Sequence, residues 1–190
     1  MKHRPLLLAS ASPRRAELLT TAGIPFECVP SYADELPSGT CSPDMLVVEN
    51  ARRKAEDVSS RFPGRIVLGA DTMVVLDGQA LGKPLDRADA KRILRALSGR
   101  THQVMTGVCV TDGNKTETAL SVTSVTFRSL DDALIETYVA SGECDDKAGA
   151  YGIQGKGCIL VEHLEGDYFG VVGLPVCLTD QILSRFSACR

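Results

Sequence analysis

The sequence predicts an α/β protein with a mixed sheet, and two observations lead to this fold class. Short apolar runs alternate with helical patterns along the first half of the chain, which is typical of strands joined by helices. The segment 74–81 carries an Asp-Gly pair between two apolar runs, which indicates an antiparallel hairpin. Because no internal repeat or low-complexity linker interrupts the chain, we expect one domain over residues 1–190.

The individual elements follow from the apolar pattern and its interruptions. The expected strands are 6–9, 26–29, 66–70, 73–76, 104–110, 121–127 and 158–161. The expected helices are 13–22, which ends before Gly23, 42–60, which begins at Ser42-Pro43, a third between Asp86 and Gly99, then 130–141 and 176–186.

The composition fits one globular core, or one core divided by a cleft, because 44% of the 190 residues are hydrophobic. The net charge of −3 and the aromatic share of 5% argue against a nucleic-acid or anionic-membrane partner. No apolar run is long enough to span a membrane, and the run after the basic start is too short for a signal peptide, so we expect a cytoplasmic protein. The seven cysteines are odd in number and widely spaced, which fits neither a disulfide framework nor a zinc knuckle.

The stretch from Ser10 to Arg15 has the features of a phosphate-binding site. Small hydroxyl residues follow an apolar run, Ser12 suits the N-cap of a helix that begins at Pro13, and the N–H groups at a helix start attract anions. Arg14 and Arg15 add planar donors that match phosphate oxygens in pairs. Taken alone, the stretch also fits a capped helix with two solvated arginines.

A carboxylate and a lysine are expected to meet at the mouth of a cleft. Asp71 ends an almost purely apolar run, and an acid at the carboxyl end of a strand commonly faces a ligand crevice. Lys83 follows the hairpin, whose return brings it back toward Asp71. The alternative for Asp71 is that its side chain caps a turn.

Lys54 and Glu35 complete the charged candidates. Lys54 lies along the apolar stripe of the second helix, so that it either extends out of the core or faces an adjacent cleft. Asp34 and Glu35 lie in the loop before that helix, and with Asp71 they offer hard oxygen ligands suited to Mg²⁺ or Mn²⁺. Together, the cationic groups and carboxylates suit hydrolysis of a polyphosphate, which depends chiefly on positioning and charge neutralisation.

The segment 146–157 is rich in glycine, which permits close approach of the backbone to a ligand. Within it, Gln154 offers both a donor and an acceptor to a base edge. The segment matches neither a P-loop nor a Rossmann fingerprint, and a tight structural loop is the alternative interpretation.

The chain carries an ordered set of motifs: Ser-Ala-Ser-Pro-Arg-Arg at 10–15, Leu-Gly-Ala-Asp-Thr at 68–72, Gly-Lys-Pro at 82–84, Lys-Ala-Gly-Ala-Tyr-Gly-Ile-Gln-Gly at 147–155, and Gly-Asp-Tyr at 166–168 followed by Val-Val-Gly-Leu-Pro at 171–175. This set, which extends from about Leu6 to the last helix, resembles the Maf family of nucleoside triphosphate pyrophosphatases. The resemblance implies an elongated, two-lobed α/β fold with a twisted mixed sheet and a central cleft, similar to ITPase, and often a homodimer.

The resemblance also implies a reaction and roles for residues. A nucleoside triphosphate would be hydrolysed between its α and β phosphates, giving a monophosphate and pyrophosphate, with a divalent cation as cofactor: Mg²⁺ or Mn²⁺, with Co²⁺ as a further candidate. Asp71 would accept the proton of the attacking water and, together with Glu35, bind the metal. The phosphates would be held by Ser10, Arg14, Lys54 and Lys83.

The pair Arg14 and Arg15, with Thr72 and Gln154, resembles the branch of the family that acts on dTTP and UTP rather than the branch that acts on 7-methyl-GTP. We therefore expect an enzyme that removes excess or modified pyrimidine nucleotides, with a link to arrest of cell division. Two positions depart from the family pattern, since Gly82 stands where Glu is frequent and Gly170 where Asn is frequent. Neither departure removes a group assigned to the chemistry.

Two other functions fit parts of the pattern. A nucleotide-binding regulatory module of septum formation, without significant hydrolysis, would use the same basic pocket. The carboxylates of Glu35 and Asp71 favour the enzyme, because negative charge facing an anion benefits a binder only when a metal intervenes. An α/β domain in which the motif residues are purely structural is the third hypothesis.

Overall fold

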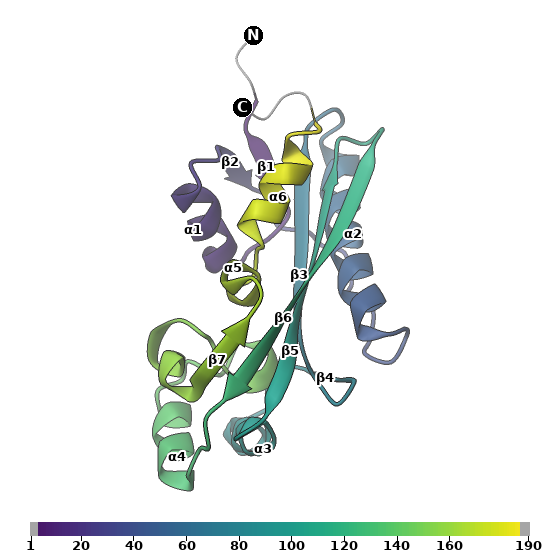
Figure 1. Ribbon diagram of the computed structural model, residues 1–190. Coiled ribbons are helices and arrows are strands. Elements are labelled where there is room, and N and C mark those ends of the chain that lie inside the picture. Colours follow the sequence, from purple (N-terminus) through teal and green to yellow (C-terminus); the bar gives the residue numbers. More distant parts are fainter. Residues whose placement is uncertain (1–3, 187–190) are drawn as a thin grey trace.

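The computed structural model describes residues 4–186 and consists of one mixed sheet with helices on both faces (Figure 1). Residues 1–3, part of the basic start considered above, and residues 187–190 lie outside this description. In chain order the elements are β1 (Leu6–Leu8), α1 (Pro13–Thr21), β2 (Phe26–Cys28), α2 (Pro43–Arg61), β3 (Val67–Leu76), β4 (Gln79–Leu81), α3 (Arg87–Leu97), β5 (Thr101–Thr111), β6 (Thr116–Phe127), α4 (Asp132–Ala140), the 3₁₀ segments η1 (Ala148–Ala150) and η2 (Gly155–Leu160), β7 (Val161–Glu165), α5 (Tyr168–Val172) and α6 (Val176–Leu183).

The strand order confirms a mixed sheet. Along the sheet the order is β2-β1-β3-β5-β6-β7, and β4 pairs with β3 off this path. β1 runs parallel to both of its neighbours, whereas every other pair is antiparallel. The expected Asp-Gly hairpin joins β3 to β4 through Asp77 and Gly78, both with positive φ.

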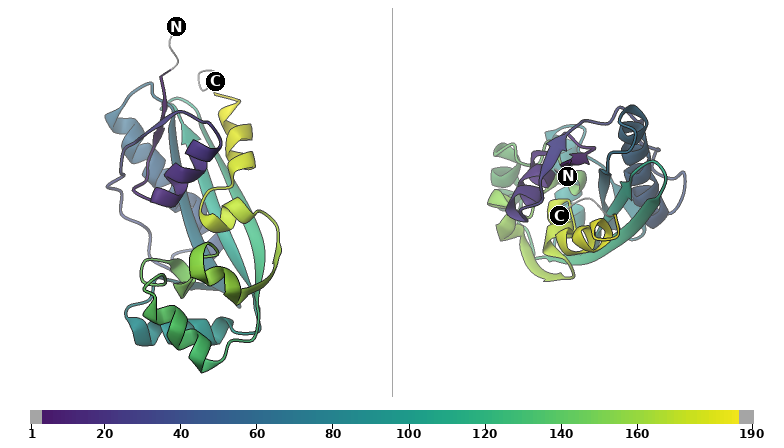
Figure 2. Two further views of the ribbon diagram at one scale, coloured as in Figure 1. Left: turned by 90° about the vertical axis from the view of Figure 1, so that its left-hand side faces the viewer. Right: turned by 90° about the horizontal axis from the view of Figure 1, so that it is seen from above.

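The molecule is elongated, as expected (Figures 1 and 2). The long strands β3, β5 and β6 run through its length, with β1, β2 and α1 gathered toward one end and α3 and α4 at the other. Among residues 4–186, no helix is long and apolar enough to cross a membrane.

The largest departure from the expected elements is the continuity of β3. The runs 66–70 and 73–76 were expected as separate strands, but residues 67–76 form one strand. The join is held because Asp71 and Thr72 stay in register with Gly107 and Thr106 of β5. Asp71 therefore lies in the middle of a strand, and its expected place at a strand end is wrong.

Two further differences lie near the C-terminus. The expected strand 158–161 is instead mostly the end of η2, and β7 begins at Val161. Gly155 precedes this run with a φ of 65°, which starts a turn rather than an extended chain. The short helix α5 was not expected; it begins where the side chain of Asp167 accepts hydrogen bonds from the Phe169 and Gly170 N–H groups.

Both faces of the sheet are buried. The smaller apolar cluster lies between α2 and the sheet, and the larger one covers the opposite face and reaches α3, α4 and α6. The smaller cluster consists of Leu7, Ala9, Ala51, Ala55, Val58, Val67 and Cys109.

The helix α2 lies close against the sheet because glycines stand beneath it. A Cβ atom at Gly69 would be 2.3 Å from the Ala51 carbonyl oxygen, and one at Gly107 would be 2.4 Å from the Val47 carbonyl oxygen. Both glycines share the sheet face of Asp71, since Gly69 precedes it by two residues and Gly107 pairs with it. The close approach therefore brings α2 side chains to Asp71.

We expect Gly107→Ala to lower the free energy of unfolding by about 1–3 kcal/mol, because the added methyl meets helix backbone that cannot turn aside. Urea unfolding measures this. Gly82→Ala is the control, because a Cβ there meets nothing within 4 Å, and its unfolding free energy should equal that of the wild type. Equal stability of both variants would contradict the packing described here.

Candidate active site

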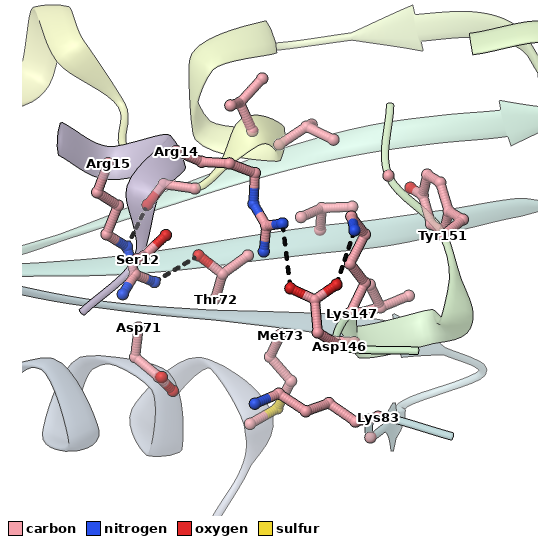
Figure 3. A pocket seen from close by; sticks show the side chains of 18 of the residues that line it. Ser12, Arg14, Arg15, Asp71, Thr72, Met73, Lys83, Asp146, Lys147 and Tyr151 are labelled. Atoms are coloured by element: carbon pink, nitrogen blue, oxygen red, sulfur yellow. Dashed lines mark hydrogen bonds and ion pairs between the residues drawn. The ribbon is translucent and has the colours of Figure 1, made fainter. Parts of the chain in front are cut away.

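A cavity of about 770 Å³ lies beside the middle of β3 (Figure 3). Its walls come from the start of α1, the loop before α2, the α2 side chains nearest β3, Lys83 after β4, and the segment 143–155. Of the site residues predicted from the sequence, the lining includes Arg14, Arg15, Glu35, Lys54, Asp71, Thr72, Lys83 and Gln154. Ser10 lies behind the wall and is 8% exposed.

The two carboxylates meet at the ammonium group of Lys54. Lys54 Nζ donates to Asp71 Oδ1 at 2.7 Å and to Glu35 Oε1 at 2.5 Å. The side chains of Lys54 and Asp71 are 15% and 11% exposed, whereas that of Glu35 is 60% exposed. Of the two interpretations of Lys54, the structure therefore supports the one in which it faces the cleft. Asp71 does not cap a turn.

The electrostatic setting keeps Glu35 ionised. Its partial burial alone would raise the pKa of Glu35, but the hydrogen bond and charge of Lys54, together with the charges of Lys83 and Arg15, outweigh burial. The pKa of Glu35 is therefore lowered. Asp34, the other acid of the loop, does not line the cavity, and its carbonyl oxygen accepts from Arg53.

Glu35 and Asp71 form a donor set that could hold a divalent cation only with help from a substrate. Within residues 4–186, no group of three or more His, Cys, Asp or Glu side chains is placed to bind a metal. Their oxygens lie within reach of a single ammonium nitrogen. Mg²⁺ commonly takes one or two carboxylates and completes its shell with phosphate oxygens and water, so this pair fits it.

The start of α1 forms the side of the cavity where anions are attracted. Ser12 is the N-cap, as predicted, and its side chain makes no capping hydrogen bond, so the hydroxyl is available to a ligand. The positive end of the helix dipole faces the same space. Arg14 crosses the cavity toward Asp146, with Nη1 and Oδ2 3.5 Å apart (Figure 3).

Arg15 is fixed within the wall rather than solvated. Its Nε donates to the Gly173 carbonyl oxygen at 2.8 Å, and its two Nη atoms donate to the hydroxyls of Ser10 and Thr72, both at 3.2 Å. Burial lowers the pKa of Arg15, and the nearby charge of Asp71 opposes that effect. Arg15 therefore has a defined position before any ligand arrives.

Lys83 and Gln154 have no such ties. Both are exposed and line the cavity, and neither side chain takes part in a hydrogen bond or salt bridge found among residues 4–186. A charge without a salt-bridge partner and a free amide are suited to contacts with an anion and with a base edge, respectively.

Sequence reasoning missed three polar residues around the cavity. Asn50 is buried and donates to Asp71 Oδ2 at 3.4 Å. Its spacing of four residues from Lys54 on one helix was the signal that could have revealed it. Asp146 pairs with Arg14, and Tyr151 lies in the wall of the cavity. No local sequence signal predicts either position.

Tyr151 is supported from behind by His102. The Tyr151 hydroxyl and His102 Nε2 are 2.8 Å apart, and both rings pack edge-to-face with Phe127. His102 is 2% exposed, and its Nδ1 has no hydrogen-bond partner. Burial lowers the pKa of His102 to about 4, so the imidazole is neutral in the folded protein.

The buried His102 predicts a pH dependence of stability. In the unfolded chain His102 becomes protonated below its pKa of 6.5, whereas in the folded chain it stays neutral down to about pH 4. The stabilisation present above pH 6.5 is therefore lost as the pH falls from 6.5 to about 4. We expect a loss of about 3 kcal/mol from this residue. In His102→Gln, the free energy of unfolding should fall less steeply over that range, which urea unfolding at several pH values measures. Parallel curves for the two proteins would contradict the prediction.

Comparison with known proteins gives a consistent set of relatives. Residues 5–186 match the family model described as Maf-like protein. A dTTP/UTP pyrophosphatase of Symbiobacterium thermophilum is 52% identical over 181 residues, which are 95% of this chain and 93% of that protein. A dTTP/UTP pyrophosphatase of Bacillus mycoides is 48% identical over 185 residues, which are 97% of each chain.

Solved structures show the same fold at low sequence identity. A HAM1 protein from Coxiella burnetii aligns with a TM-score of 0.55 and 16% identity, over 95% of this chain and 98% of that one. The Ham1 protein of Staphylococcus aureus aligns with a TM-score of 0.50 and 14% identity, over 84% and 81%. These likenesses concern the fold alone.

Proposed function

The chain belongs to the family of Maf-like proteins, and from this premise we propose that it is a nucleoside triphosphate pyrophosphatase that acts on dTTP and UTP. The observation that carries the proposal is the convergence of Glu35 and Asp71 with the four cationic side chains predicted from the sequence in one cavity, from parts of the chain far apart in sequence. Relatives named dTTP/UTP pyrophosphatase align with this chain over almost their whole length. The reaction releases a monophosphate and pyrophosphate.

The phosphates would be held by the start of α1 and by cationic side chains around it. The Ser12 hydroxyl and the first N–H groups of the helix offer donors, and Arg14 offers a planar pair. Because Arg14 is paired, within the described range 4–186, only with an exposed carboxylate at 3.5 Å, an incoming phosphate can take the place of that carboxylate. Lys83, which also lines the cavity, would add a further positive charge to neutralise the phosphates.

Glu35 and Asp71 would hold the divalent cation, Mg²⁺ or Mn²⁺. When bound, such a cation supplies charge neutralisation of the triphosphate and orientation of its oxygens. Lys54 would release the carboxylates to it and turn its ammonium toward the phosphates, since its side chain lines the same cavity.

Asp71 is proposed to accept the proton of the water that attacks the α phosphorus. Its side chain is mostly buried and anchored in the middle of β3, so that its oxygens have fixed positions. The water oxygen forms the new bond to phosphorus, the bond to the bridging oxygen breaks, and pyrophosphate leaves with the electron pair. The monophosphate keeps the oxygen that came from water.

The pyrimidine base would be recognised by two parts of the cavity: the fixed side chains of Arg15 and Thr72, and the unattached amide of Gln154. Arg15 and Thr72 are locked in a hydrogen-bonded wall that continues through Thr106 to the Gly170 carbonyl oxygen. Gln154 is unattached and can present both its oxygen and its nitrogen to a base edge. A fixed wall limits the size of the base, while the free amide reads its edge.

Incubation of the purified chain with dTTP or UTP and Mg²⁺ or Mn²⁺ tests the proposal. We expect release of pyrophosphate and monophosphate, little turnover of dGTP, and loss of activity in EDTA. Release of orthophosphate and a nucleoside diphosphate would show that a different bond is cleaved. Tight nucleotide binding in EDTA with no product would instead favour a regulatory binding module.

A further inference from the structure

Asn50 is a buried polar side chain that the proposed mechanism leaves without a role. It lies one turn before Lys54 on α2 and is 3% exposed. Its Nδ2 donates to Asp71 Oδ2 at 3.4 Å, and its Oδ1 accepts from the Leu36 N–H at 2.9 Å. Because Leu36 directly follows Glu35, this amide joins the strand that carries one carboxylate to the loop that carries the other.

The two partners determine which way the amide points. The carboxylate of Asp71, which also accepts from Lys54, can only accept a hydrogen bond, and the backbone N–H of Leu36 can only donate one. The reverse orientation of Asn50 would place two acceptors together on one side and two donors on the other. Leucine at this position would satisfy neither partner, and aspartate would satisfy only Leu36.

Lys54 also joins the two carboxylates, but through a contact that a divalent cation disrupts. Its ammonium occupies the space next to Asp71 Oδ1 and Glu35 Oε1, and a second cation at those oxygens would be repelled by it. Asn50 is neutral and uses the other oxygen of Asp71, Oδ2. Its two hydrogen bonds can therefore persist when those of Lys54 are lost.

The loop 29–42 needs such a contact because it contains neither helix nor strand. Further hydrogen bonds attach it to α2, but away from the carboxylate of Asp71. In one of them Arg61 donates to the Pro30 carbonyl oxygen at 2.8 Å. The Tyr32 N–H donates to Asp57 at 2.9 Å, and Arg53 donates to the Asp34 carbonyl oxygen at 3.1 Å. These bonds hold the loop near the helix without setting its distance from β3.

We propose that Asn50 is a positioning residue, which keeps Asp71 and the Glu35 loop at the spacing that a divalent cation requires once Lys54 has withdrawn. The inference rests on the proposed function, since it assumes that these carboxylates bind the cation. Its distinctive consequence is that removal of an uncharged side chain, whose hydrogen bonds go to Asp71 and Leu36, weakens metal binding as well as turnover.

The test compares Asn50→Leu and Asn50→Asp with the wild type. Mn²⁺ binding is measured by electron paramagnetic resonance in the presence of the α,β-methylene analogue of dTTP, and kcat for dTTP is measured at saturating Mn²⁺. For Asn50→Leu we expect the Kd for Mn²⁺ to rise and kcat to fall, each by about tenfold or more. For Asn50→Asp, which keeps the Leu36 bond, we expect kcat to fall by about tenfold without weaker Mn²⁺ binding.

Asp57→Ala is the matched control, because it releases the same loop at Tyr32 without touching either carboxylate. Its Kd and kcat should stay within about twofold of the wild type, the size of change expected of a site not in contact with the ligands. Equal losses in Asp57→Ala and Asn50→Leu, or no loss in Asn50→Leu, would overturn the inference. If Asn50→Leu does not fold, the near-isosteric Asn50→Asp decides.

The failure of this inference and that of the proposed function can be told apart. If the wild type releases no pyrophosphate from dTTP or UTP, the proposed function fails, and Mn²⁺ binding alone then decides the role of Asn50. If the wild type is active and the Asn50 variants match it in both measurements, only the positioning role is wrong.

Discussion

Asp71→Asn is expected to lower the rate of pyrophosphate release by about a hundredfold or more. The amide keeps the size of the side chain and can still accept from Lys54, but it cannot take a proton from water and is a poor metal ligand. A loss in kcat at saturating dTTP and Mg²⁺ is the expected signature, because the phosphate-binding groups are unchanged. Steady-state kinetics with a pyrophosphate assay measures it.

Asp77→Asn is a control for the same chemical change. Asp77 lies in the turn between β3 and β4 with a φ of 51°, a conformation that asparagine adopts readily, and it does not line the cavity. Its kcat should equal that of the wild type. Near-normal turnover in Asp71→Asn would remove Asp71 from the role of proton acceptor and leave the reaction without an assigned base.

Lys54→Met is expected to have two effects of opposite sign. Turnover should fall by about a hundredfold, because a positive charge near the developing negative charge on the phosphates is lost. In the absence of nucleotide, Mn²⁺ should bind more tightly, because no ammonium then competes for the oxygens of Asp71 and Glu35. Kinetics and an Mn²⁺ titration of the nucleotide-free protein measure the two effects.

Lys91→Met serves as the matched variant. Lys91 pairs with Glu136 between α3 and α4, outside the cavity. Neither its turnover nor its Mn²⁺ binding should change. Weaker Mn²⁺ binding in Lys54→Met would show that Lys54 supports the metal site and does not compete with the cation.

The parts of the site that the sequence revealed are those with local signals. The start of α1 was predicted because Ser12 and Pro13 mark a helix start whatever the rest of the chain does. The position of Asp71 within its strand was predicted wrongly, because the continuity of β3 depends on pairing with β5, more than thirty residues away. Asn50 offered only its spacing of four residues from Lys54, since its two partners are distant in sequence and meet it only in the folded chain.

The fold class was predictable for a related reason. Alternating apolar runs and helix boundaries depend on residues close together in sequence, so the strands and helices of the first half lie close to the expected ranges. The region after α4 was less predictable, because its backbone is shaped by glycine turns and by contacts with β3 and β6. Its apolar run at 158–161 consequently became mostly 3₁₀ helix rather than strand.

Asp71 lies in the middle of a long strand, so the residue proposed to act in hydrolysis is held more rigidly than the residue proposed to recognise the base. A residue hydrogen-bonded into a ladder with neighbours before and after it has little freedom to shift. Gln154, in contrast, lies outside the strands, and its side chain has no hydrogen-bond partner among residues 4–186. Substitutions around Gln154 can therefore change which nucleobases bind, while Asp71 keeps its position in the sheet.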